Sequence, residues 1–323
     1  MSGSAQQQIR LLAEQMNRSV IGQESVVHSL LLALLCNGNV LLEGLPGTAK
    51  TRSIKTLAKL LGVNLGRIQF TPDLLPADVT GSETYHDSES GQGQLTFQPG
   101  PIFNELVLAD EINRAPAKVQ AALLEAMEER QVTVAGKTYP LPHLFLVMAT
   151  QNPIEQDGTY PLPEAQMDRF LFKVKVGYPD AEAERAIVQM LQQEEGSDAA
   201  EFTSIDPEVV LKAREAIQKI AVSSPVEKYL VDLVMATRHP ESLSPTLANW
   251  ISIGASPRAS IALHRAARAE AWYQDRDHVL PEDVRKVAPA VLCHRLMLSY
   301  DALADGADSD RVIEELLGLV AAG

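Results

Sequence analysis

The chain has few of the residues that build disulfide frameworks or metal centres. It contains only 2 cysteines among 323 residues, which excludes a disulfide-rich scaffold. Cys36 and Cys293 both stand in apolar surroundings and belong to no metal-ligand spacing, so we expect two buried free thiols. The 7 histidines are scattered and form no pattern of ligands. A structural metal site of cysteine or histidine is therefore not predicted.

Basic residues and long apolar runs are also scarce. The 28 lysines and arginines stand against 42 aspartates and glutamates, which gives a formal net charge of −14. Nucleic-acid binding needs concentrated basic residues, so we expect no nucleic-acid partner. The apolar run from Leu30 to Cys36 is too short for a bilayer, and Met1 to Arg18 lacks the apolar core of a secretory signal. We expect a cytoplasmic protein without an integral membrane segment.

A glycine-containing loop stands between an apolar run and a helical pattern near the start of the chain. Residues 40–43 are typical of a buried parallel strand, and residues 50–61 have helical spacing. The loop and the first helical residues read Gly44, Leu45, Pro46, Gly47, Thr48, Ala49, Lys50 and Thr51. This order of strand, loop and helix indicates a phosphate-binding loop, whose backbone N–H groups surround a phosphate at a helix N-terminus.

The side chains of this loop predict a nucleotide with a magnesium ion. Lys50 would reach the β- and γ-phosphates, and the hydroxyl of Thr51 would bind Mg²⁺. The regular loop has a glycine before the lysine, whereas this chain has Ala49. Because a methyl group is small and helical backbone angles suit alanine, this departure is compatible with the same function.

A second apolar run, residues 105–109, ends in two adjacent carboxylates. We expect Asp110 to hold Mg²⁺ through water and Glu111 to polarise the water that attacks the γ-phosphate. The alternative is a pair of acidic residues that merely cap the next helix. The phosphate-binding loop upstream favours the catalytic interpretation.

A third apolar run, residues 144–150, leads to Asn152. An amide just beyond the carboxyl end of a central strand can bind the γ-phosphate or the attacking water, because ligands of open α/β sheets bind at that end. An isolated Asn-Pro pair is usually only a turn. The prediction for Asn152 therefore depends on its place after the two earlier motifs.

Strand-like and helix-like segments alternate up to residue 178. This alternation predicts an α/β domain, 1–178, with a mostly parallel sheet covered by helices on both faces. Two segments interrupt it: an excursion rich in Gly, Ser and Gln at 82–100, and a hairpin at 131–142. We expect residues 179–323 to form an all-helical second domain, since each helix start has a capping residue or a proline. The five expected strands are 40–43, 65–70, 105–109, 144–150 and 170–176.

Together these motifs resemble the AAA+ ATPases, and more narrowly the MoxR family, over essentially the whole chain. The most specific segments are 43–51, 109–115, 149–153, 168–170 and 256–258, and Ala49 fits the family's own version of the loop. The resemblance implies an AAA+ P-loop core and a C-terminal helical lid, with ATP and Mg²⁺ as cofactors. It also implies that the two interruptions are a helix-2 insert and a pre-sensor-1 hairpin.

The resemblance assigns further roles to single residues. It implies that Asn152 is sensor 1, that Arg258 is sensor 2, and that Val20 and Ile21 line the adenine pocket. Arg258 lies at the start of a helix in the second domain. It could therefore meet a γ-phosphate held by the first domain only if the two domains close over the nucleotide.

The arginine finger is Arg169 by the same resemblance. Its place at an edge would let it reach a neighbour's phosphate, and the alternative is a pair with Asp168 or Glu164 of its own chain. Arg114, next to the two carboxylates, is a second candidate for contact with a neighbouring subunit.

The resemblance implies a Mg²⁺-dependent ATPase that works as a homo-oligomeric ring, a hexamer in this family. Its client would be a protein with a von Willebrand factor A domain, which it remodels or activates for metal-cofactor insertion or complex maturation. One alternative is the ATPase motor subunit of a magnesium-chelatase-like complex. A nucleic-acid motor or initiator is opposed by the acidic charge. A scaffold that binds ATP with little turnover is opposed by Glu111, because degenerate sites commonly lose this carboxylate.

Overall fold

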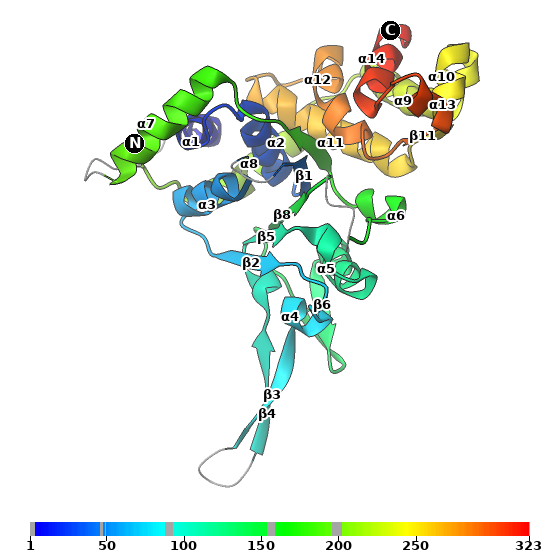
Figure 1. Ribbon diagram of the computed structural model, residues 1–323. Coiled ribbons are helices and arrows are strands. Elements are labelled where there is room, and N and C mark those ends of the chain that lie inside the picture. Colours follow the sequence, from blue (N-terminus) through cyan, green and yellow to red (C-terminus); the bar gives the residue numbers. More distant parts are fainter. Residues whose placement is uncertain are drawn as a thin grey trace.

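A five-stranded parallel sheet forms the centre of the first part of the chain, in a computed structural model that describes residues 4–45, 48, 50–87, 93–153, 159–195 and 202–322. Its order is β2-β5-β8-β1-β9, and every neighbouring pair is parallel (Figure 1). The predicted α/β class and five-stranded parallel sheet are confirmed. The strands are β1 (Val40–Gly44), β2 (Leu65–Gln69), β5 (Leu106–Asp110), β8 (Leu146–Gln151) and β9 (Phe172–Val176).

Helices cover both faces of this sheet, which is why its central strands are almost continuously apolar. Successive residues of β5 alternate between two buried clusters, one on each face. One cluster contains the buried sides of α1 (Ala5–Ser19), α2 (Glu24–Leu35) and α3 (Lys50–Leu61). The other contains the buried side of α5 (Ala117–Glu129). The sheet is thus the middle layer of three.

The segment at 131–142 forms a tight hairpin. Its strands are β6 (Gln131–Val134) and β7 (Lys137–Pro140), which pair antiparallel. The two turn residues between them, Ala135 and Gly136, both have positive φ angles, 49° and 79°. Two consecutive residues of this kind make the turn that best matches the twist of paired strands.

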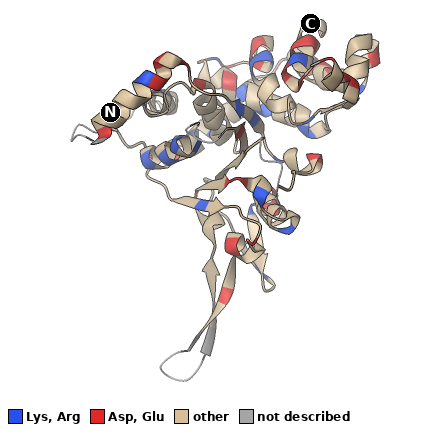
Figure 2. Ribbon diagram, viewed as in Figure 1, with Lys and Arg blue, Asp and Glu red and all other residues tan. Residues whose placement is uncertain are grey.

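The segment at 82–100 forms a longer antiparallel ribbon of β3 (Gly81–Asp87) and β4 (Gly93–Pro99). Figure 1 shows this ribbon projecting from the sheet as an arm. Its described residues carry no Lys or Arg (Figure 2). Phe97 on the ribbon stacks on Tyr139 of the short hairpin with ring centroids 4.0 Å apart, so the two excursions touch each other.

Helices make up most of the second part, and their starts follow the expected capping residues. Ser256, for example, accepts a hydrogen bond from the amide of Arg258, and Pro257 is the first residue of its helix. The helices are α7 (Ala181–Glu195), α8 (Glu208–Gln218), α9 (Ser224–Arg238), α10 (Pro245–Trp250), α11 (Pro257–Tyr273), α12 (Pro281–Leu292), α13 (Tyr300–Ala304) and α14 (Ser309–Leu319).

The second part is not wholly helical, which corrects the prediction in one detail. β10 (Ile251–Ile253) pairs antiparallel with β11 (Met297–Leu298). Strands of three and two residues are too short to show an alternating pattern in the sequence. Their pairing joins two segments that lie about 45 residues apart in the chain.

The two parts share one continuous hydrophobic core. α8 and α11 pack against α1 and α2, and their buried residues belong to a single cluster. The buried carboxylate of Glu270 on α11 reinforces this junction, because it lies 2.6 Å from Nε2 of His28 on α2 and 2.5 Å from the ammonium of Lys286 on α12. None of the helices in the described part of the chain combines the length and apolarity needed to cross a membrane.

Both cysteines are free, but they are partly rather than fully buried, which corrects the prediction. Each lies at the C-terminal cap of a helix. Cys36 caps α2 and Cys293 caps α12. Burial raises the pKa of Cys36 to about 12 and that of Cys293 to about 11, so both remain thiols at neutral pH.

Candidate nucleotide-binding site

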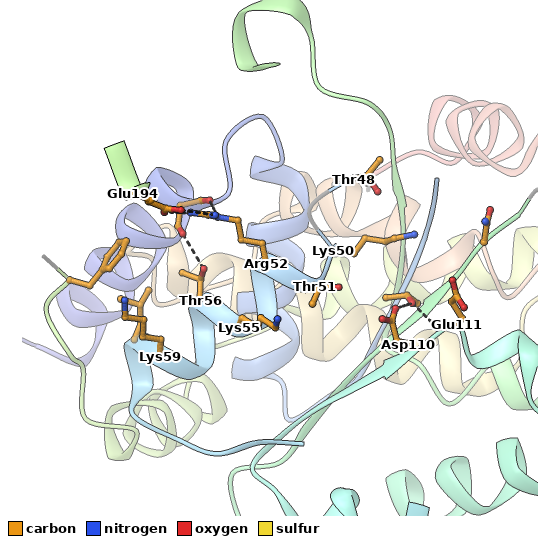
Figure 3. Close-up of a pocket in the computed structure, with 15 residues that line it drawn as sticks. Thr48, Lys50, Thr51, Arg52, Lys55, Thr56, Lys59, Asp110, Glu111 and Glu194 are labelled. Carbon is orange, nitrogen blue, oxygen red and sulfur yellow. Dashed lines mark hydrogen bonds and ion pairs between the residues drawn. The ribbon is translucent and has the colours of Figure 1, made fainter. Parts of the chain in front are cut away.

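A cavity of about 690 Å³ lies beyond the carboxyl ends of β1, β5 and β8 (Figure 3). Parallel strands end at one edge of the sheet, so residues from three separate motifs meet there. Several of the predicted site residues therefore line one cavity. They are Thr48, Lys50, Thr51, Asp110, Glu111 and Asn152.

The phosphate-binding loop is described in part. Pro46, Gly47 and Ala49 lie outside the described residues. Gly44 ends β1, where a Cβ atom would stand 2.5 Å from the carbonyl oxygen of Val176 on β9. Glycine is thus required at this position by the packing of two strands.

Lys50 and Thr51 open α3 at the edge of the cavity. The Lys50 ammonium donates a hydrogen bond to the carbonyl of Gly44, and Figure 3 shows its side chain extending towards the strand ends. Burial lowers the pKa of Lys50, while the charges of Asp110 and Glu111 oppose this shift. The Thr51 hydroxyl has no hydrogen-bond partner within the described part of the chain. A cation and an available hydroxyl thus face the same space.

Asp110 is held between two neighbouring strands. One carboxylate oxygen accepts a hydrogen bond from the Thr150 hydroxyl on β8 at 2.7 Å. The other lies 2.9 Å from a guanidinium nitrogen of Arg67 on β2. The carboxylate is therefore oriented before any ligand binds.

Glu111 has a left-handed backbone, with φ of 58°. This conformation costs a non-glycine residue roughly 1–2 kcal/mol, so such residues concentrate at functional sites. The amide of Glu111 donates to the Thr150 hydroxyl at 2.9 Å. Its carboxylate accepts a hydrogen bond from Gln69 and pairs with Arg114, each at 3.2 Å. At the end of β5, the Glu111 carboxylate is thus held by contacts different from those that hold Asp110.

Three residues of this network were not predicted from the sequence: Arg67, Gln69 and Thr150. Arg67 and Gln69 are two apart on β2, so their side chains lie on the same face of the strand. Only the strand order places β2 beside β5 and brings them to the two carboxylates. Thr150 ends a run whose apolar character gave no indication of a role for its hydroxyl.

Of the residues predicted to contact the γ-phosphate or the adenine base, Asn152 lines the cavity, whereas Val20 and Ile21 do not. Asn152 is 8% exposed, lines the cavity, and accepts a hydrogen bond from Asn113 through its backbone carbonyl. The described residues that line the cavity include neither Val20 nor Ile21. Val20 is buried at the end of α1, and Ile21 is half-buried beside it.

Arg169 and Arg258 lie together at the opposite edge of the sheet. Both line a groove of about 390 Å³ that also includes Asn39, the residue before β1. β1 has 5 residues and is about 16 Å long. That length exceeds the reach of an arginine side chain. The structure therefore does not place Arg258 at the phosphate site of its own chain, because Ser256 anchors its helix to Asp168 at this far edge.

Both arginines share one partner that the sequence did not indicate. Glu128, near the end of α5, binds Arg169 through one carboxylate oxygen at 2.5 Å and Arg258 through the other. Arg169 therefore does form an ion pair within its own chain, as the alternative expected, but its partner is Glu128 and not Asp168 or Glu164. Asp168 instead binds Arg295, whose side chain is 3% exposed.

Comparisons with known proteins agree with these motifs. The family described as "ATPase family associated with various cellular activities (AAA)" matches residues 39–172, and an AAA lid domain matches residues 248–316. A crystal structure from Cytophaga hutchinsonii superposes with a TM-score of 0.90 at 43% identity, covering 98% of this chain and 95% of that one.

Relatives with similar sequences extend along almost the whole chain. "Chaperone MoxR1" of Mycobacterium tuberculosis is 47% identical over 95% of this chain and 80% of its own length. "Uncharacterized protein YeaC" of Bacillus subtilis is 42% identical over 95% of this chain and 92% of its own. "Protein MoxR" of Paracoccus denitrificans is 37% identical over 88% of this chain and 87% of its own. The chain therefore belongs to the MoxR family of AAA+ ATPases.

Proposed function

We propose that this protein hydrolyses ATP with Mg²⁺ in the cavity at the carboxyl edge of its sheet. The observation that carries the proposal is the convergence of Lys50, Thr51, Asp110 and Glu111 on that cavity. A cation and a hydroxyl suit phosphates and their metal, whereas two carboxylates supply a metal contact and a general base.

The residues present fit a magnesium ion that is bound chiefly through the nucleotide. The described residues contain no group of three or more His, Cys, Asp or Glu side chains that could hold a metal alone. Mg²⁺ usually keeps several waters and takes few protein ligands beside substrate phosphates. Thr51 and Asp110 would hold it here, and when bound it would neutralise charge on the phosphates.

Glu111 is our candidate for the base that accepts a proton from the attacking water. Gln69 and Arg114 keep its carboxylate in place, and the left-handed backbone directs it away from the strand. Asn152 would orient the water or the γ-phosphate from the next strand. Arg169 is our candidate for the arginine that acts between chains, because it lies in the groove away from the cavity of its own chain, whereas Arg114 pairs with Glu111 beside that cavity.

We further propose that Arg169 and Arg258 act on the nucleotide of a neighbouring copy. They lie at the amino edge of the sheet, away from the cavity of their own chain. The surface that provides the arginines therefore differs from the surface that holds the nucleotide. Head-to-tail assembly into a ring joins two unlike surfaces of this kind. By family resemblance that ring would be a hexamer.

The proposed role in the cell is remodelling of a client protein with a von Willebrand factor A domain, in the cytoplasm. The name "Chaperone MoxR1" of the relative from Mycobacterium tuberculosis supports a chaperone-like role. The projecting arm offers no basic residues among those described, which speaks against a nucleic-acid client (Figure 2).

Two substitutions test the hydrolytic site. Lys50→Ala should abolish ATP binding in calorimetry, because the ammonium neutralises phosphate charge. Glu111→Gln should still bind ATP but lose turnover, because an amide cannot accept a proton. Lys118→Ala, an exposed lysine on α5, is the control and should change neither property. Unchanged ATP affinity of Lys50→Ala, or normal hydrolysis by Glu111→Gln, would overturn the assignment.

Mixing two inactive variants tests whether the arginines act between chains. Arg169→Ala keeps its own site, and Glu111→Gln keeps arginines that it can lend. When the two variants mix randomly in equal amounts, the intact site of an Arg169→Ala chain meets the intact arginine of a Glu111→Gln chain at about a quarter of head-to-tail interfaces. ATPase activity should therefore return on mixing, once native mass spectrometry has shown mixed oligomers. No recovery in such oligomers would mean that Arg169 does not act in trans.

A further inference from the structure

The carboxylate of Glu128 is divided between the two arginines. Its Oε2 atom receives Nε of Arg169 at 2.5 Å, and its Oε1 atom receives an Nη atom of Arg258. The hydrogen bond from Arg169 lowers the pKa of Glu128 below its usual value, and the charge of Arg258 adds to this effect. All three side chains are between 30% and 44% exposed, so the cluster faces solvent at the rim of the groove.

The position of Glu128 in α5 is unfavourable for the helix itself. It lies in the last turn, where the helix dipole favours cations, and Glu129 follows it directly. Glu129 has no ion pair within the described part of the chain. The contribution of Glu128 must therefore come from the arginines it binds and not from helix capping. This contrast makes Glu129 a matched control.

The backbones that carry the two arginines are fixed by a second carboxylate. Asp168 precedes Arg169, and its Oδ1 atom binds the buried Arg295 at 2.7 Å. Its Oδ2 atom accepts a hydrogen bond from Ser256 at 2.7 Å, and Ser256 caps the helix that begins with Arg258 in its first turn. Asp168 thus joins the bases of the two arginines, whereas Glu128 joins their tips.

We propose that Glu128 is a positioning residue that aligns Arg169 and Arg258 as a pair for the nucleotide of the neighbouring copy. This inference rests on the proposed action of the arginines between chains. Without a carboxylate between them, two like charges repel and their side chains spread over more rotamers. Glutamine keeps the shape of glutamate, but its amide oxygen can accept from only one guanidinium while its NH₂ group faces the other.

Removal of the Glu128 charge should lower ATP turnover, because the arginines lose their alignment, but it should not weaken ATP binding. Displacement of an arginine by about 1 Å can cost about 10²-fold in rate, because transition-state contacts depend on placement. Loss of the carboxylate also leaves more positive charge beside the phosphates, which favours ATP binding. Glu128→Gln should therefore lower kcat about 10²-fold without raising KM. A purely structural defect would instead lower the melting temperature together with the active fraction.

The first experiment compares Glu128→Gln with Glu129→Gln in steady-state ATPase assays and thermal melts. Both variants remove one negative charge from the same turn of α5. Only Glu128→Gln should lose turnover, and both should melt like the wild type. Glu128→Asp keeps the charge but is one methylene shorter, so it should also be slow. Wild-type kcat for Glu128→Gln, or an equal loss in Glu129→Gln, would overturn the proposal.

The second experiment assigns Glu128 to the lending side of the interface. Glu128→Gln keeps its own hydrolytic site, so mixing with Glu111→Gln should restore activity, as the mixture of Arg169→Ala and Glu111→Gln does. Mixing Glu128→Gln with Arg169→Ala should restore nothing, because both chains then lend defective arginines. Recovery in this last mixture would overturn the role of Glu128 in aligning Arg169.

The mixtures also separate this inference from the proposed function beneath it. Failure of Arg169→Ala with Glu111→Gln in proven mixed oligomers contradicts action between chains. Success of that mixture together with failure of Glu128→Gln with Glu111→Gln contradicts only the role of Glu128. Each outcome therefore points to one statement.

Discussion

Asp168→Asn should lower the free energy of unfolding by about 3 kcal/mol, because it strands a buried guanidinium. The side chain of Arg295 is 3% exposed, and its Nε atom lies 2.7 Å from the Asp168 carboxylate. Burial lowers the pKa of Arg295, and the charge of Asp168 is the main influence that opposes the shift. The ion pair thus keeps a charged residue inside the junction of the two parts of the chain.

The magnitude follows from what remains after the substitution. Removal of one partner of a buried ion pair costs about 3–5 kcal/mol. The lower end applies here because Arg295 also donates to the backbone carbonyls of Phe170, Leu171 and Val291, which the substitution leaves in place. Asparagine can still offer one oxygen, either to Arg295 or to Ser256.

Urea unfolding of four proteins tests this reasoning: the wild type, Asp168→Asn, Arg295→Met and the double variant. Because methionine removes the stranded charge, the double variant should be more stable than the sum of the single costs predicts, by about 1 kcal/mol or more. Glu164→Gln, an exposed acid four residues away, is the control and should be nearly neutral. Strictly additive costs would refute the pair as the source of stability.

Two further substitutions test the site and the junction. Thr150→Val keeps the shape of the side chain but removes the hydroxyl that joins Asp110 to the Glu111 amide. A hydrogen bond to a charged group contributes about 1.5–3 kcal/mol, so its loss should slow ATP turnover about 10-fold or more. Normal kcat for this variant would show that Asp110 is held by other contacts. Burial raises the pKa of Glu270, but the contact with His28 and its other hydrogen bonds bring it to about 2, below the ordinary value of 4.5. Its stabilisation is therefore complete above pH 4.5 and is lost as the pH falls towards 2. The stability difference between wild type and Glu270→Gln, followed by urea unfolding, should stay constant from neutral pH to about pH 4.5 and shrink as the pH falls further towards 2. A difference that stays constant below pH 4.5 would contradict this linkage.

The sequence allowed the class of fold to be predicted, because its evidence is local. Apolar runs of strand length alternate with helical patterns, and this alternation is sufficient to indicate a parallel sheet between helices. The order of the strands depends on contacts between segments far apart in the chain, so it could not be predicted. The pairing of β10 with β11 had the same limit, since neither strand is long enough to show a pattern.

The same distinction explains which site residues were found. Lys50, Thr51, Asp110 and Glu111 belong to short motifs, and the structure places all of them at one cavity. Glu128 belongs to no motif and resembles any acid on an exposed helix. Its partners are 41 and 130 residues away in the chain, so only the fold reveals it.

The separation of the two edges has a consequence for the proposed assembly. The cavity lies at the carboxyl edge of the sheet and the arginine pair at the amino edge, so under the proposed function the arginines of one copy do not reach its own cavity in this conformation. A two-fold dimer would supply arginines to both sites only if the cavity and the arginine pair of each copy lay in one shared surface, whereas they lie at opposite ends of the strands. A head-to-tail contact joins unlike surfaces, and an open row of copies leaves one site at its end incomplete. Under the proposed action between chains, a closed head-to-tail ring completes every site, so ATP turnover per chain should rise with protein concentration until assembly is complete.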